Sequence, residues 1–68
     1  MKPSGVGQIF RERRKSLGLD LQALSNRCGL SRAQICKIEL QGKMSVASLF
    51  AIAESLGLEI IIKPKEPT

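Results

Sequence analysis

The stretch DLQALSNRCGLSRAQICKIEL, residues 20–40, decides the fold, because it specifies two short helices joined by a tight turn. Asp20 stands at a helix N-cap position, since apolar residues recur on one helical face from residue 21 to residue 28. Gly29 suits the left-handed residue that ends such a helix. Ser31 is the next N-cap, and the helix after it is expected to run to about residue 40.

These two helices carry the residues that a close crossing requires. Ser25 is small at the expected crossing point, and Gly29 allows a positive φ in the turn. The apolar contacts that lock the crossing angle are assigned to Leu24, Leu30, Ile35 and Ile38. Two helices joined in this way form a helix-turn-helix unit, in which the second helix is presented to the major groove of DNA.

Two further helices flank this unit. Apolar residues at helical spacing from about Val6 to Leu17 predict an amphipathic helix that ends at Gly18. Ser45 caps a later helix that ends at Gly57. The later helix is the most apolar in the chain, and we expect it to be the central buried element.

The chain of 68 residues is long enough for one small domain. We expect a mainly α, four-helix domain at residues 6–57, preceded by a flexible N-terminus at residues 1–5. A strand that serves dimerisation is expected at residues 58–63, followed by a flexible tail at residues 64–68.

The predicted strand has no partner within an otherwise helical chain, although its backbone groups need one. Pairing with the same strand of a second subunit across a two-fold axis is the simplest solution. Leu58, Ile60 and Ile62 would then pack on the last helix, and Ile61 would lie on the opposite face of the strand. The alternative is a disordered or merely docked tail.

The formal charge of +5 is unevenly distributed along the chain. Residues 1–43 carry nine Lys and Arg against three acidic residues, whereas residues 44–68 carry two against three. Segregated positive charge suits a face that binds a polyanion, because each neutralised phosphate releases counterions. The alternative is a basic surface that serves only solubility.

The residue types present argue against several other functions. The chain has no His, and its only cysteines, Cys28 and Cys36, do not form a CxxC pair, so we expect neither a metal site nor a cofactor. No nucleophile and base set, carboxylate pair or phosphate loop indicates an enzyme. No apolar run suggests a signal peptide or membrane span, and we expect a cytoplasmic protein. Cys28 is read as a small core residue, and a redox role for Cys36 stays open.

From about Ile9 to Leu56 the chain resembles the Cro/C1-type (XRE) helix-turn-helix family. The run IFRERRKSLGLDLQALSNRCGLSRAQICKIELQGK, residues 9–43, matches that family in order, spacing and loop lengths. The residues in register are Arg14, Gly18, Leu19, Leu24, Gly29, Ile35, Ile38 and Glu39. The resemblance implies a lambda-repressor-like fold and a bacterial or phage-encoded, nucleoid-associated regulator that binds double-stranded DNA. It also implies a buried ion pair, or clamp, between Arg14 and Glu39.

Helix geometry and this resemblance together assign the contacts with DNA. The helix after Ser31 directs its first residues and residue 37 outward, so the expected base-reading residues are Arg32, Ala33, Gln34 and Lys37. Gln34 is placed to reach either a base or a phosphate. The expected phosphate contacts are the amides of Leu21 and Gln22, the Ser31 hydroxyl and Lys43. At positions 20 and 21 the family often has Thr or Ser followed by Gln, whereas this chain has Asp20 and Leu21. This departure puts in doubt the contact that side chains at these two positions usually make with phosphate.

A strand after the fourth helix, in place of a fifth helix, is closer to HipB-type antitoxins than to phage repressors. We therefore expect a transcriptional regulator, with repression as the expected activity, that acts as a homodimer on an inverted-repeat operator. The alternative is an antitoxin that binds a toxin protein and autoregulates its own operon. The DNA-binding residues are the same in both cases.

Overall fold

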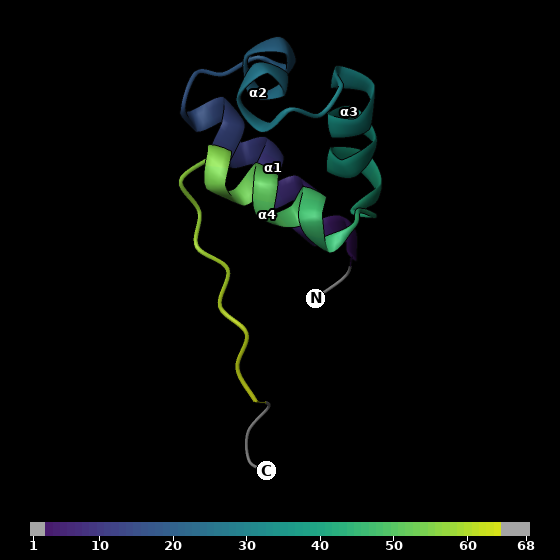
Figure 1. Ribbon diagram of the computed structural model, residues 1–68, viewed down its shortest axis with the longest axis vertical. Coiled ribbons are helices and arrows are strands. Elements are labelled where there is room, and N and C mark those ends of the chain that lie inside the picture. The colour runs from purple at the N-terminus through teal and green to yellow at the C-terminus, as the bar shows by residue number, and fades with distance from the viewer. Residues whose placement is uncertain (1–2, 65–68) are drawn as a thin grey trace.

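The computed structural model describes residues 3–64, with side chains from residue 5 onward. It contains four helices, which are α1 (Pro3–Ser16), α2 (Leu21–Cys28), α3 (Arg32–Gln41) and α4 (Val46–Ser55). Contacts between helices join α1 to α3, α2 to α3, and α2 to α4. The segment after α4 extends away from the helices (Figure 1). No helix in the described part of the chain is long and apolar enough to span a membrane.

The boundaries of α2, α3 and α4 follow local signals, and the predicted helices are confirmed. Asp20, Ser31 and Ser45 have extended backbones, and each side chain accepts a hydrogen bond from the backbone N–H three residues later. Gly29 and Gly42 end α2 and α3 at φ values of 79° and 71°, in the left-handed region that glycine enters most easily.

The first helix begins earlier than its apolar pattern predicts. It starts at Pro3 instead of about Val6, because proline is well suited to the first helical position, where its missing N–H removes no bond. Residues 3–5 of the predicted flexible N-terminus therefore belong to the first turn of α1. Residues 1–2 and residues 65–68 lie outside the described part of the chain.

Gly7 brings α1 against the backbone of α3. A Cβ atom at this position would lie 2.6 Å from the carbonyl oxygen of Glu39 and closer still to that of Ile38. Only glycine permits this approach, which carries Phe10 into the core. The buried apolar residues are Phe10, Leu24, Ile35, Ile38, Ile52, Ala53 and Leu56.

The expectation that α4 is the central buried element is wrong for the single chain. Ile52 and Ala53 are buried, but Val46 is 68% exposed and Phe50 is 50% exposed. Helix α4 packs mainly against α2, so only one of its faces is covered within the described chain. The high apolar content of this helix therefore leaves a second, solvent-facing apolar surface.

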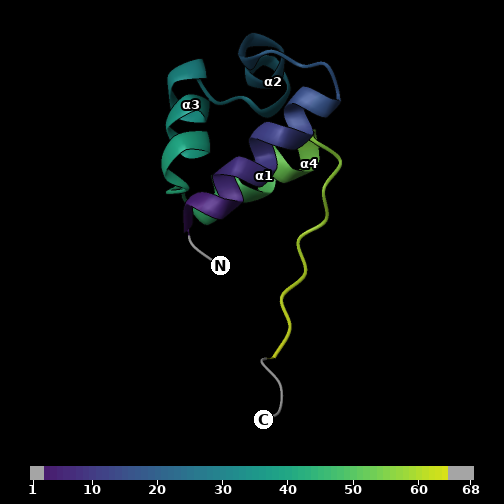
Figure 2. The same cartoon turned by 180° about the vertical axis from the view of Figure 1, so that it is seen from behind.

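The segment after α4 has no regular secondary structure through residue 64. The N–H of Leu58 donates to the carbonyl oxygen of Ala53 over 2.8 Å, and Leu58 and Ile60 pack against the core as expected. Ile62, expected on the same face, is instead 88% exposed, because the segment has left the helices by that point (Figure 2). The strand and its pairing stay predictions, since a strand needs a second strand beside it.

Candidate nucleic-acid interface

Helix α3 has one buried face and one exposed face. Ile35, Ile38 and Glu39 are buried against the other helices. The four side chains expected to read bases are all exposed: Arg32, Ala33, Gln34 and Lys37. The helix thus holds Ile35 and Ile38 in the core while it presents these four side chains to solvent.

The expected ion pair between Arg14 and Glu39 is present and bidentate. Arg14 Nε donates to Glu39 Oε2 over 2.8 Å, and Arg14 Nη2 donates to Glu39 Oε1 over 3.1 Å. A third donor, Nη1, bonds the carbonyl oxygen of Leu19 over 2.9 Å. Arg14 is 8% exposed and Glu39 is 9% exposed, and the hydrogen bond with Glu39 raises the pKa of Arg14 above its usual value. The pair connects α1 to the exposed helix and to the loop before α2.

The turn between α2 and α3 is held by short-range bonds. Ser25 donates its hydroxyl hydrogen to the carbonyl oxygen of Leu30, and the N–H of Gly29 donates to the carbonyl oxygen of Ser25 over 2.9 Å. The turn therefore fixes the direction in which α3 leaves α2.

The start of α3 is a capping box that the sequence patterns above did not identify. The N–H of Gln34 donates to Ser31 Oγ over 3.1 Å, and the N–H of Ser31 donates to Gln34 Oε1 over 3.0 Å. The signal was available, because Ser followed by Gln three residues later is the spacing that this motif uses. The side chain of Gln34 thus stabilises the helix end and also faces solvent.

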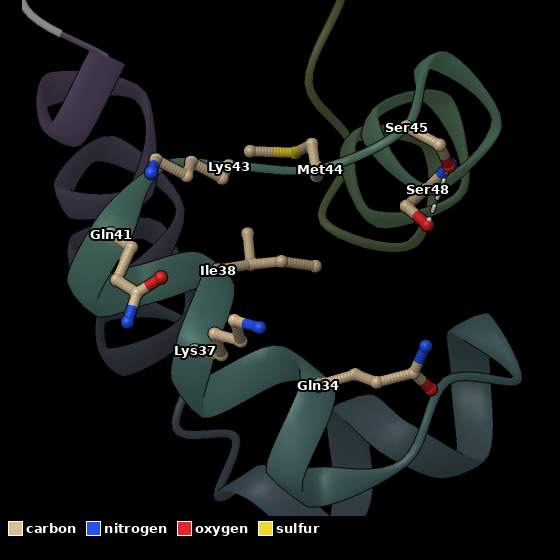
Figure 3. A pocket seen from close by; sticks show the side chains of 8 residues that line it. All are labelled: Gln34, Lys37, Ile38, Gln41, Lys43, Met44, Ser45 and Ser48. Atoms are coloured by element: carbon tan, nitrogen blue, oxygen red, sulfur yellow. Dashed lines mark hydrogen bonds between the residues drawn. The ribbon is translucent and has the colours of Figure 1, made fainter.

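A groove of about 520 Å³ separates α3 from the start of α4, and we call it the α3–α4 groove. Its lining residues are Gln34, Lys37, Ile38, Gln41, Lys43, Met44, Ser45 and Ser48 (Figure 3). Three of these polar residues, Gln41, Ser45 and Ser48, were not predicted as site residues. Figure 3 shows Gln34 and Lys37 on the α3 wall and the two serines on the α4 wall. The donors that line the groove suit a negatively charged or acceptor-rich ligand.

The start of α2 has two amides available for an external acceptor. The Asp20 side chain accepts from the N–H of Ala23 over 2.7 Å, and the N–H of Leu24 donates to the Asp20 carbonyl oxygen. The N–H groups of Leu21 and Gln22, which are predicted to contact phosphate, precede those of Ala23 and Leu24 in the first turn of the helix. The side chain of Gln22 donates one hydrogen bond, from Nε2 to Asn26 Oδ1 within α2 over 2.9 Å.

The cationic side chains that are predicted to contact DNA face solvent. Among the residues whose side chains are described, Arg14 and Glu39 form the one ion pair. Arg13, which had no predicted role, donates from Nε to the Leu56 carbonyl oxygen over 2.9 Å and connects α1 to the end of α4. Arg32, Lys37 and Lys43 are exposed, so their charge is available to a polyanion.

Both cysteines are free thiols, with Cys28 packed against the core and Cys36 exposed on α3. No group of three or more potential metal ligands occurs among the residues whose placement is described.

The comparisons with known proteins agree with this geometry. The helix-turn-helix family profile matches residues 10–62, which is most of the chain. A protein of Rhodospirillum rubrum that is named as a transcriptional regulator in the ATPase CF(0) region is 41% identical over 56 residues. That alignment covers 81% of this chain and 52% of the relative, so the chain spans about half the length of that protein. The chain belongs to the Cro/C1-type (XRE) helix-turn-helix family of DNA-binding regulators.

Proposed function

We propose that this protein binds double-stranded DNA sequence-specifically and represses transcription as a homodimer on an inverted-repeat operator. The observation that carries this proposal is the division of α3 into a buried face and an exposed one. The buried Arg14–Glu39 pair anchors the helix, while Arg32, Ala33 and Lys37 are exposed for base edges. Arginine and lysine donate to guanine O6 and N7, and the alanine methyl group suits the thymine methyl group.

Contacts with phosphate would come from segments before and after α3 in the chain. The amides of Leu21 and Gln22 lie at the start of α2, and Lys43 lies in the loop between α3 and α4. The Ser31 oxygen accepts from the N–H of Gln34, and the hydroxyl hydrogen of Ser31 is left as a donor to phosphate. Such contacts position the protein on the duplex without reading sequence.

The segment at residues 58–63 supports the homodimer. Its backbone makes no hydrogen bond to another described residue beyond the one from Leu58, although its β-branched side chains favour a strand. Pairing with a second copy would satisfy these groups and would relate the two α3 helices by a two-fold axis. Two such helices read half-sites about 34 Å apart, or one turn of DNA.

In vitro selection from random duplex DNA tests the central claim. The expected result is an enriched inverted repeat with half-sites about 10 base pairs apart from centre to centre. Arg32→Ala is expected to cost about 1–3 kcal/mol of binding free energy on the selected site only, whereas Lys43→Ala should weaken all duplexes alike. Equal losses on selected and random DNA for both variants would contradict this division of roles.

Sedimentation of an Ile61→Pro variant tests the dimer. Proline removes one ladder donor, so the dimer should weaken, while the matched Ile61→Val variant keeps its N–H and should remain dimeric. A proline variant that sediments as wild type would instead favour an interface on the exposed face of α4, where Val46 and Phe50 lie.

An antitoxin is the second candidate function. The exposed apolar side chains of Ile61 and Ile62 beyond α4 favour it, because a toxin protein as well as a second subunit could cover them. Expression with neighbouring genes and purification of the chain discriminates the two functions. A larger protein that co-purifies in stoichiometric amounts supports the antitoxin, and a homodimer alone supports the stand-alone repressor.

A further inference from the structure

Two consecutive arginines connect α1 to different parts of the molecule. Arg13 donates from Nε to the carbonyl oxygen of Leu56, the residue that follows α4, over 2.9 Å. Arg14 forms the buried bidentate pair with Glu39 on α3. Because neighbouring residues of a helix point in directions about 100° apart, α1 holds both elements at once. The end of α4 is thereby connected, through α1, to the helix that is predicted to read bases.

The bond from α1 lies at the point where the chain leaves α4. The N–H of Gly57 donates to the carbonyl oxygen of Glu54 over 3.2 Å, and the N–H of Leu58 donates to that of Ala53 over 2.8 Å. These two bonds form the Schellman motif, which ends many helices. Neither bond uses the carbonyl group of Leu56, and the arginine on α1 supplies the donor for it.

The Leu56 carbonyl group belongs to the planar peptide unit that leads into Gly57, so a bond that holds this oxygen also holds the direction of the chain after it. The segment then packs Leu58 and Ile60 on the core and extends away from the helices (Figures 1 and 2). Its six residues, 58–63, span roughly 20 Å when extended. A rotation of about 10° at this peptide would move the far end by about 3.5 Å, close to the rise of about 3.4 Å per base pair.

We propose that Arg13 is a positioning residue that sets the spacing between the two half-sites of the operator; this inference rests on the proposed homodimer. In that dimer, the angle at which the segment leaves α4 places each α3 relative to the two-fold axis. The Arg13–Leu56 bond holds this angle, and the Arg14–Glu39 pair holds α3 on the same helix. Binding to a duplex with a different spacing requires the angle to change and the Arg13 bond to break.

The variants Arg13→Met and Arg13→Gln separate the hydrogen bond from the charge. Both remove the positive charge, and methionine also removes every donor. Glutamine keeps a donor, because its Nε2 atom is as many bonds from the backbone as the Nε atom of arginine. The ratio of affinities for the preferred spacing and for one base pair more should fall by roughly 2- to 10-fold in Arg13→Met, which corresponds to the net contribution of one hydrogen bond. Arg13→Gln should keep the wild-type ratio.

In vitro selection from inverted repeats of variable spacing measures the preferred spacing, and titration of duplexes that differ by one base pair measures the ratio. Circular dichroism and sedimentation of each variant check that the helices and the dimer are intact. A role confined to stability or to overall charge lowers affinity for all spacings by the same factor, so an unchanged ratio in Arg13→Met would overturn the inference. Equal falls in Arg13→Met and Arg13→Gln would also overturn it, because the charge and not the bond would then be responsible.

The wild-type protein distinguishes failure of this inference from failure of the proposed function. A wild-type dimer that enriches one spacing, together with an unchanged ratio in Arg13→Met, removes only the role of Arg13. A wild-type protein that is monomeric or enriches no inverted repeat overturns the homodimer and this inference with it. The expected result is a dimer with one preferred spacing, which relaxes in Arg13→Met and is retained in Arg13→Gln.

Discussion

Gly7 is where α1 meets the backbone of α3, and Gly7→Ala is expected to lower the free energy of unfolding by about 1–3 kcal/mol. The added Cβ would lie 2.6 Å from the Glu39 carbonyl oxygen, about 0.7 Å inside the shortest ordinary carbon-to-oxygen contact of about 3.3 Å. The neighbouring Ile38 carbonyl oxygen is closer still. Both obstacles are backbone atoms, so no side-chain rotation relieves the overlap and the helices must separate.

The separation required is large enough to weaken packing between the two helices. A gap of 0.5 to 1 Å removes roughly a quarter to a half of the dispersion energy of facing atoms, and Phe10 and Ile38 lie at this interface. Alanine is a better helix former than glycine by about 1 kcal/mol, which opposes the loss without cancelling it. The net expectation is therefore destabilisation.

Urea unfolding followed by circular dichroism measures this effect. Both proteins are compared at one concentration, because dimerisation would couple stability to concentration. Gln8→Ala is the control: Gln8 is the next residue of α1, it is exposed, and its change should stay within about 0.5 kcal/mol. If Gly7→Ala unfolds at the same or a higher urea concentration than wild type, helix propensity dominates and the close approach of α1 to α3 is refuted.

Three other perturbations follow from the same structure. Glu39→Ala should lower the free energy of unfolding by about 3–5 kcal/mol, because it leaves the Arg14 guanidinium buried without its carboxylate. The double variant Arg14→Met, Glu39→Leu should recover most of that loss in urea unfolding. Equal losses in the single and the double variant would contradict coupling between the two residues. Gly29→Ala forces an alanine to adopt a φ of 79° and should cost about 1–2 kcal/mol, and an unchanged melting temperature would disprove the strain. The logarithm of the DNA-binding constant should fall linearly with the logarithm of salt concentration, and Lys43→Ala should reduce that slope by about 1; a flat dependence would exclude phosphate contacts.

Most helix boundaries were predictable because their signals are local. Asp20, Ser31 and Ser45 cap the amides three residues ahead, and Gly29 ends α2 in a conformation that glycine favours. Each signal acts within one turn of chain, so it can be read without knowledge of the fold. The earlier start of α1 at Pro3 shows the weakness of apolar spacing, which detects buried positions and not helix ends.

The candidate site was predictable only in part. The exposure of Arg32 and Lys37 follows from the same periodicity that buries Ile35 and Ile38. The pairing of Arg14 with Glu39 was expected only from the family resemblance, since nothing local connects residues 25 positions apart. The second role of Gln34 was readable from its spacing to Ser31, but the orientation of its amide required the structure.

The sequence by itself determined the four helices, the order in which they occur, the positive charge of residues 1–43 and the family to which the chain belongs. The tertiary structure alone decided how these helices meet. Gly7 against the α3 backbone, Arg13 on the Leu56 carbonyl, the α3–α4 groove and the uncovered face of α4 all depend on the crossing of helices distant in sequence. The physical reason is range: caps and periodicity act over three or four residues, whereas helix packing depends on the shapes of surfaces that meet only after the chain has folded.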